Sequence, residues 1–142
     1  MVVSSTLSSN ADAGSLCSYQ LRSDGVHEFI FHEASRAGVN QWTDQLVHIL
    51  EASPHDAVVP IIVDTRFSSM LPIAYTIEKL RDVYLNCAGC PTMRLAFLSG
   101  NTALMLFVQM LAQMAASNEA DRIQYHQSPT EADATAWLLA AQ

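Results

Sequence analysis

VVPIIVD at residues 58–64 is followed by the helical pattern IAYTIEKLRDVYL at 73–85, and this strand–helix pair indicates the fold class. Two similar units come next: MRLAFLS at 93–99 with TALMLFVQMLAQMAA at 102–116, and DRIQYHQ at 121–127 with SPTEADATAWLLAA at 128–141. Short apolar runs that alternate with amphipathic segments of this length are typical of βαβ crossovers. The second half of the chain therefore predicts a largely parallel sheet covered by helices.

The first half predicts a hairpin and one helix. CSYQLR at 17–22 and VHEFIFHE at 26–33 flank Ser23-Asp24-Gly25, and Asp-Gly supplies the positive φ angles of a tight turn. Both faces of the second strand mix apolar and polar residues, so we expect it at or near an edge of the sheet. Residues 36–52 predict a helix. Its buried stripe at helical spacing comprises Val39, Trp42, Leu46, Ile49 and Leu50.

Together these elements predict one α/β domain over residues 16–142. We expect a mostly parallel five-stranded sheet, with the N-terminal hairpin strand antiparallel, and four helices. Residues 1–15 contain five serines and no aromatic residue, and we interpret them as a flexible tail.

Three local expectations follow from proline and capping signals. Pro60 cannot donate to a strand ladder, so we place it at the strand start. The second helix is expected to begin near Pro72, with proline in its first turn. For the last helix we expect Ser128 as N-cap, followed by Pro129 and by Glu131 as the partner in a capping box.

The two tryptophans are expected to be the large anchors of their helices. Trp42 lies on the apolar stripe of residues 36–52, and Trp137 falls near one face of the last helix with Ala132, Ala136 and Leu139. Truncation of a buried aromatic side chain such as Trp137 to alanine costs about 3–5 kcal/mol. We therefore expect a loss of that size.

Composition excludes several classes of function. The 142-residue chain carries 7 basic and 14 acidic residues, a net charge of −7, which disfavours nucleic acid and anionic membrane surfaces. The longest apolar segment, 103–114, is interrupted by Gln109 and Gln113, so no membrane span is expected. The N-terminus is a poor signal peptide, and three cysteines do not suggest a disulfide framework. We expect a cytoplasmic protein.

Two apparent motifs have simpler explanations. Cys87-Ala88-Gly89-Cys90 follows a helix, where the helix dipole disfavours a thiolate, and a zinc site would need a second cysteine pair. We interpret it as a helix-ending loop that binds no metal and forms no catalytic disulfide. His27-Glu28 and His32-Glu33 differ in spacing from H-E-x-x-H and lie in a strand, where the two histidines face opposite sides.

The best candidate site by position follows the strand at 58–64. Asp64, Arg66, Ser68 and Ser69 come at its end, and Ser99 ends the next strand. Because the carboxyl ends of adjacent parallel strands lie on one edge of a sheet, we expect these residues to cluster there. A purely structural role in capping and turning the chain is the competing interpretation.

No catalytic set can be assembled from these loops. They contain no histidine to activate a nucleophile, and the chain has no G-x-G-x-x-G or Walker loop. We therefore expect no catalytic residues, no metal and no cofactor. The methionine-rich segment at 103–114 could line a lipophilic cavity or a partner groove, although burial in the core explains it more simply.

The order of elements resembles that of the STAS/SpoIIAA-like superfamily, in particular its small stand-alone bacterial members. The resemblance covers roughly residues 17–141 and rests on IIVDTR at 61–66, MRLAFLS at 93–99 and the closing EADATAWLL at 131–139. It implies a βα superhelix and a cytoplasmic, non-enzymatic domain of the anti-sigma-factor-antagonist type, which binds a regulatory kinase or another signalling protein.

The resemblance also implies a switch and an alternative. Antagonists of this family are phosphorylated on a serine of a D-S-S-G segment, and Ser68 and Ser69 lie in the comparable loop, which reads FSSMLP here. CRAL-TRIO-type relatives imply instead a small apolar or lipid-like ligand. An enclosed apolar cavity of at least ~300 Å³ would favour the ligand, and a solid core with an exposed apolar patch would favour a protein. The sequence leaves open whether the chain forms a homodimer.

Overall fold

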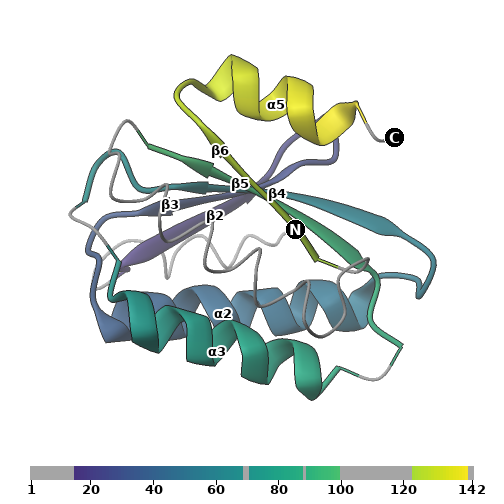
Figure 1. The fold of residues 1–142 in the computed structure, drawn as a ribbon, viewed down its shortest axis with the longest axis horizontal. Helices are drawn as coiled ribbons and strands as arrows, with labels where there is room; N and C mark the ends of the chain where they lie inside the picture. The colour runs from purple at the N-terminus through teal and green to yellow at the C-terminus, as the bar shows by residue number, and fades with distance from the viewer. Residues whose placement is uncertain (1–14, 69–70, 88, 100–122, 141–142) are drawn as a thin grey trace.

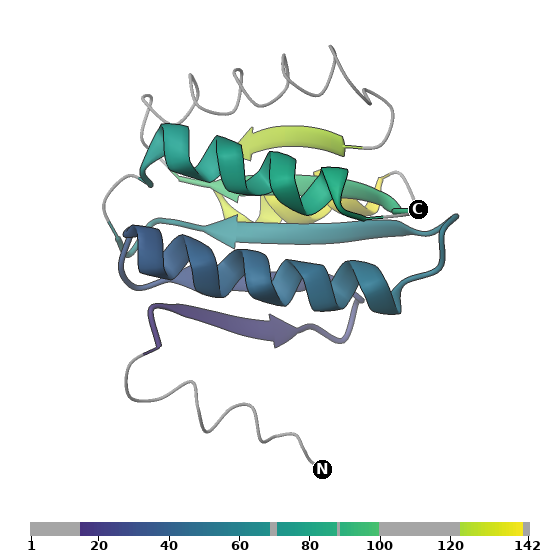
Figure 2. The ribbon, with the colours of Figure 1, turned by 90° about the horizontal axis from the view of Figure 1, so that it is seen from below.

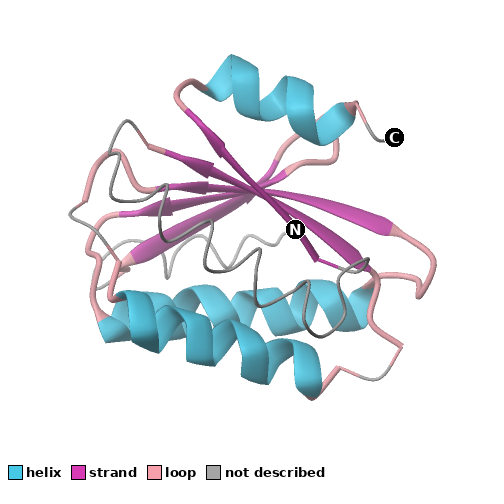
Figure 3. Cartoon of the chain, in the orientation of Figure 1, coloured by secondary structure: helices cyan, strands magenta, loops and turns pink. Residues whose placement is uncertain are grey.

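The computed structural model describes residues 15–68, 71–87, 89–99 and 123–140. These residues form a five-stranded mixed sheet and three helices (Figures 1 and 3). In chain order the elements are β2 (Cys17–Leu21), β3 (His27–Phe31), α2 (Arg36–Ala52), β4 (Val58–Asp64), α3 (Ile73–Leu85), β5 (Thr92–Leu98), β6 (Ile123–Ser128) and α5 (Glu131–Leu139). The strand order is β2-β3-β4-β5-β6, with β2 antiparallel to β3 and every other pair parallel.

The sheet confirms the predicted α/β class and the antiparallel hairpin strand. Gly25 has φ 88° in the turn, where the Gly25 amide donates to the carbonyl of Arg22 at 3.0 Å. β2 and β6 are the edge strands of the described sheet, and β3 lies next to β2, near the edge, as the mixed faces of β3 predicted. The central strands β4 and β5 are buried along nearly their whole length, which agrees with their continuous apolar sequences.

Helices cover both faces of the sheet. α2 and α3 lie side by side on one face, and α5 lies on the other (Figures 1 and 2). The predicted boundaries of α2 are confirmed, and Ser35 caps it by accepting a hydrogen bond from the Gly38 amide at 3.2 Å. The whole predicted apolar stripe of α2 is buried, including Trp42.

The start of the last helix differs from the prediction. α5 begins at Glu131, and its N-cap is Thr130, whose side chain accepts from the Asp133 amide at 3.1 Å. Ser128 belongs instead to β6, where it pairs with Leu98. The last strand therefore continues through Ser128, because pairing with β5 outweighs the local capping signal of Ser128-Pro129.

The packed face of α5 was also predicted incorrectly. Ala134 and Leu138 are its buried residues, whereas Trp137 is only partly buried. Ala134 and Leu138 of this nine-residue helix pack against Val26, Ile62, Ala96 and Leu98. Trp137 lies at the margin of this contact.

Pro60 is the third residue of β4, not its first. It pairs with Arg94 of β5, while pairing between β3 and β4 begins only at Ile61. The missing amide therefore costs least on the β3 side, where the ladder has not yet begun.

Two expectations fall wholly or partly outside the described residues. The predicted helix around 103–114 lies there, so the described part of the chain contains three of the four expected helices. The predicted tail at 1–15 lies there except for Ser15. None of the helices described is long and apolar enough to cross a lipid bilayer.

The cysteine pair differs from the sequence interpretation. Cys87 and Cys90 lie between α3 and β5, after a helix as expected, but they are joined as a disulfide with a Cα–Cα separation of 5.3 Å. The odd number of cysteines had not suggested this bond. Cys17 remains a free thiol, and burial raises its pKa to about 12.

Candidate functional site at the carboxyl edge of the sheet

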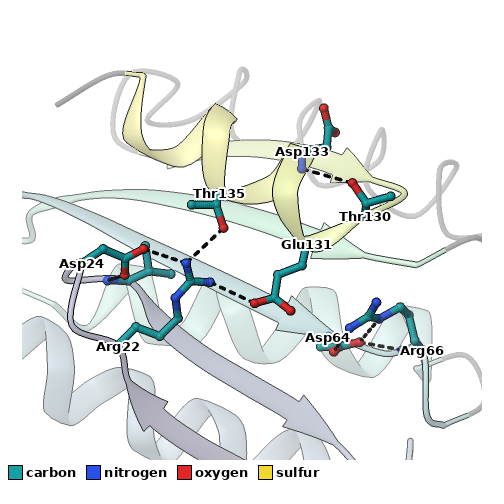
Figure 4. A network of polar contacts seen from close by, with 9 residues as sticks. Arg22, Asp24, Asp64, Arg66, Thr130, Glu131, Asp133 and Thr135 are labelled. Atoms are coloured by element: carbon teal, nitrogen blue, oxygen red, sulfur yellow. Dashed lines mark hydrogen bonds and ion pairs between the residues drawn. The ribbon is translucent and has the colours of Figure 1, made fainter.

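The loop after β4 is held by a buried carboxylate. Asp64 is 1% exposed, and Arg66 binds it in a bidentate manner: Nε donates to Oδ1 at 3.1 Å and Nη2 donates to Oδ2 at 2.9 Å (Figure 4). The backbone amide of Arg66 also donates to Oδ1, at 3.0 Å. The hydrogen bond with Asp64 raises the pKa of the guanidinium, so Arg66 stays charged. The start of this loop is therefore well ordered by charge-assisted hydrogen bonds.

The predicted neighbours of this loop lie on the same edge of the sheet. Asp64 pairs with Leu98, and the Thr65 amide donates to the Leu98 carbonyl at 3.1 Å. Ser99 follows directly and its amide donates to the Ser128 carbonyl at 3.2 Å. Parallel pairing of β4, β5 and β6 thus delivers their ends to one edge, as the topology requires.

The serines of the loop are only partly described. Ser68 is half-buried, and its amide donates to the Thr65 carbonyl at 3.3 Å. Ser69 lies outside the described residues. Asp64 and Arg66 are therefore in direct contact, while Ser68 and Ser99 belong to the same edge through their backbones.

Phe67 is the residue of this loop that the sequence interpretation missed. Its side chain is 66% exposed, and the Arg66 guanidinium lies 5.4 Å from the centre of its ring. A large exposed aromatic residue beside a fixed arginine is a composition enriched at protein interfaces. The signal in the sequence was an aromatic residue inside an otherwise polar loop.

A second polar network ties the β2–β3 hairpin to α5. Arg22 contacts Asp24 at 2.6 Å, Thr135 at 3.2 Å and Glu131 at 3.5 Å (Figure 4). Glu28 of β3 has a raised pKa, chiefly because of burial and then because of the negative charge of Glu131. The carboxylates of this face are partly balanced by arginines, and the described residues contain no cluster that could hold a metal ion.

Arg94 forms a third polar feature beneath α5. It is 9% exposed, and its guanidinium lies 3.9 Å from the centre of the Trp137 ring. It donates to the Trp137 carbonyl at 2.7 Å and to the side chain of Gln124. His126 stacks on Trp137 with ring centres 4.7 Å apart. Burial lowers the pKa of Arg94. This cluster orients the carboxyl end of α5 rather than forming an open site.

Two open cavities are formed on the side of α2 and α3. One, about 350 Å³, is lined by Tyr19, His27, Gln45, His48, Ile49, Ala52 and Ser53. The Tyr19 hydroxyl lies 2.7 Å from His27 Nδ1. Burial raises the pKa of Tyr19 and lowers the pKa of His27, so both groups are neutral at neutral pH. The other cavity, about 260 Å³, lies beside Cys87.

Comparisons with protein-family models, with curated proteins and with solved structures found no match to this chain.

Proposed function

We propose that this protein is a small regulatory domain that binds another protein through the loop after β4. The observation that carries the proposal is the exposed Phe67 beside Arg66, which the buried Asp64 holds in place. A fixed loop loses little conformational entropy on binding, and aromatic and arginine side chains contribute most of the affinity in many interfaces.

The resemblance adds finer assignments to this proposal. They are the βα superhelix of STAS/SpoIIAA-like domains, a bacterial and cytoplasmic setting, a non-enzymatic role, and a regulatory kinase or signalling protein as partner. Phosphorylation of Ser68 or Ser69 would place about −1.5 to −2 charges within three residues of Arg66. Such a charge competes with Asp64 for the guanidinium and so alters the surface that the partner meets.

The cavities favour a protein partner over the alternative of a small apolar ligand. A lipid-like ligand needs an enclosed, mainly apolar cavity of roughly 300 Å³ or more. The larger cavity described opens to solvent and is lined by a tyrosine, two histidines and a glutamine. The smaller one is more apolar, but it also opens to solvent and has acidic residues in its lining.

The test compares two exposed apolar residues at opposite edges of the sheet. Phe67 is 66% exposed at the carboxyl edge, and Leu85 is 69% exposed at the end of α3. Proteins captured by the wild-type chain from its native lysate are quantified by mass spectrometry beside those captured by Phe67→Ala and Leu85→Ala. The proposal expects a partner that Phe67→Ala loses by tenfold or more, which equals about 1.4 kcal/mol, and that Leu85→Ala retains.

A second set of variants addresses the switch. Ser68→Asp, Ser69→Asp and Arg66→Ala are measured for affinity to the captured partner. If these three variants and Phe67→Ala all bind like the wild type, the loop is not the interaction surface and the proposal fails.

A further inference from the structure

The two cysteines of the disulfide between α3 and β5 differ in their exposure to solvent. Cys90 is 3% exposed and belongs to the main hydrophobic core. Cys87 is partly buried and lines the open cavity of about 260 Å³. Thiol–disulfide exchange requires that the incoming thiolate reach a sulfur, so it must begin at Cys87.

The cavity beside Cys87 has an acidic rim over an apolar floor. Val47, Leu50 and Val83 form the floor, while Glu51 and Asp82 are the charged groups among the described lining residues. Glu51 lies one residue before the end of α2 and Asp82 lies in the last turn of α3, and neither helix has a basic residue in its last turn. The helix carboxyl ends add to the negative potential of the two carboxylates. An approaching thiolate that carries net negative charge is therefore repelled.

We propose that the Cys87–Cys90 disulfide is a site of reversible thiol–disulfide exchange that selects small aminothiols. The ammonium group of an aminothiol offsets the charge of its own thiolate and is attracted to Glu51 and Asp82. A neutral or acidic thiol has no such compensation. The cavity is large enough for a molecule of a few heavy atoms at Cys87.

The exchange takes two balanced steps. The thiolate of one aminothiol attacks Cys87 Sγ, the bond to Cys90 Sγ breaks, and Cys90 leaves with the electron pair and gains a proton. A second aminothiol attacks the mixed disulfide, forms the disulfide of the two aminothiols and releases Cys87 as a thiol. Two aminothiols are oxidised, and the protein disulfide is reduced by two electrons. The carboxyl end of α3 disfavours a Cys87 thiolate, so the site undergoes stoichiometric exchange and is no oxidoreductase centre.

The experiment measures the rate at which three thiols reduce the folded protein. The probes are cysteamine, 2-mercaptoethanol and 3-mercaptopropionate, whose reactive thiolate forms carry net charges of about 0, −1 and −2 on ordinary thiol, amine and carboxyl ionisation. Acid-quenched samples are analysed by mass spectrometry. Cys17 does not interfere, because burial raises the pKa of its thiol to about 12.

Each rate is divided by the rate of a variant in which Glu51→Gln and Asp82→Asn neutralise the rim, so that the intrinsic reactivity of each thiol cancels. With about a twofold effect per carboxylate and unit charge at low ionic strength, neutralisation should speed 2-mercaptoethanol about fourfold and 3-mercaptopropionate about sixteenfold. The rate with cysteamine should stay unchanged or fall. The matched control, Asp44→Asn with Glu78→Gln, removes two exposed carboxylates from the same helices outside the cavity lining and should leave all three rates unchanged.

Peptide mapping of the trapped mixed disulfide locates the reaction. The proposal expects the cysteamine adduct on Cys87. An adduct on Cys90, equal rate ratios for the three thiols, or reduction no faster than global unfolding would each overturn it.

Discussion

The two faces of the sheet are packed in different ways, although the same strands supply both. On the side of α2 and α3, Trp42 is fully buried and meets Phe31, Phe29 and Phe97 edge-on, with ring centres 5.8, 6.4 and 6.5 Å apart. On the side of α5 the apolar core is small. It consists of Val26, Ile62, Ala96, Leu98, Ala134 and Leu138.

Polar contacts contribute a larger share of the packing between α5 and the sheet. Arg22 reaches Glu131 and Thr135, and Arg94 reaches the Trp137 ring and carbonyl. Hydrogen bonds of this kind contribute about 1 kcal/mol each after the loss of hydration, less than the burial of a large aromatic ring. Burial of apolar surface therefore holds α2 and α3 on the sheet, whereas α5 depends on a few specific hydrogen bonds and ion pairs. We expect α5 to unfold locally more readily than α2 and α3.

The largest effect is expected from truncating the aromatic centre. Trp42→Ala should lower the free energy of unfolding by about 3–5 kcal/mol, because it removes a fully buried ring and leaves a cavity among three phenylalanines. Urea denaturation measures the change. A loss below about 1.5 kcal/mol would mean that the core closes around the missing ring and that this face is less specifically packed than its geometry indicates.

A smaller effect is expected from the tryptophan of the other face. Trp137→Ala should cost roughly 1–2 kcal/mol, because the ring is only partly buried and its contact with Arg94 adds a modest cation–π energy. This is below the 3–5 kcal/mol that the sequence alone suggested for a buried anchor. Hydrogen exchange should show that the amides of α5 lose protection before those of α2. Equal losses of unfolding free energy for Trp42→Ala and Trp137→Ala would contradict the difference in packing between the two faces.

The smallest expected effects are on the pH dependence of the free energy of unfolding. The two faces of the sheet should contribute to this dependence with opposite signs. Burial lowers the pKa of His27, on the α2 side, from 6.5, so the unfolded chain binds more protons there and stability falls as pH drops below about 6.5. Burial raises the pKa of Glu28, on the α5 side, from 4.5, so the folded chain binds more protons and stability falls as pH rises from about 4.5.

Two single variants separate these contributions. His27→Gln should reduce the loss of stability between pH 7 and 5, and Glu28→Gln should gain more stability relative to wild type at pH 7 than at pH 4. Each difference stays below about 1.4 kcal/mol per pH unit, the limit for one proton. Denaturation midpoints across this pH range provide the measurement, with His55→Gln on the exposed turn before β4 as the control. Parallel pH profiles for wild type and both variants would contradict the assignment.

The position of the candidate site in the fold was predictable from the sequence, but the exposure of its side chains was not. The rule that parallel strands deliver their ends to one edge located Asp64, Arg66, Ser68 and Ser99 from the sequence. Exposure, however, depends on what surrounds a side chain. Asp64 is buried under the guanidinium of Arg66, whereas Phe67, an apolar residue, faces solvent. The polarity of each residue alone would predict the opposite exposure for Asp64 and Phe67.

Elements whose signal is local and repeated were predictable from the amino-acid sequence alone. The 17 residues of α2 and the end of β4 at Asp64 were predicted correctly, because helical periodicity and a mainly β-branched run each add evidence residue by residue. Features that depend on residues distant in the chain emerged only in the folded protein. Ser128 became a strand residue because β5 offered it a partner, and Pro60 entered a strand because β3 starts pairing one residue later. Trp137 stayed only partly buried because Ala134 and Leu138 make the buried contacts of α5. At Ser128 a contact that only the folded chain supplies outweighed a local capping preference of about 1 kcal/mol.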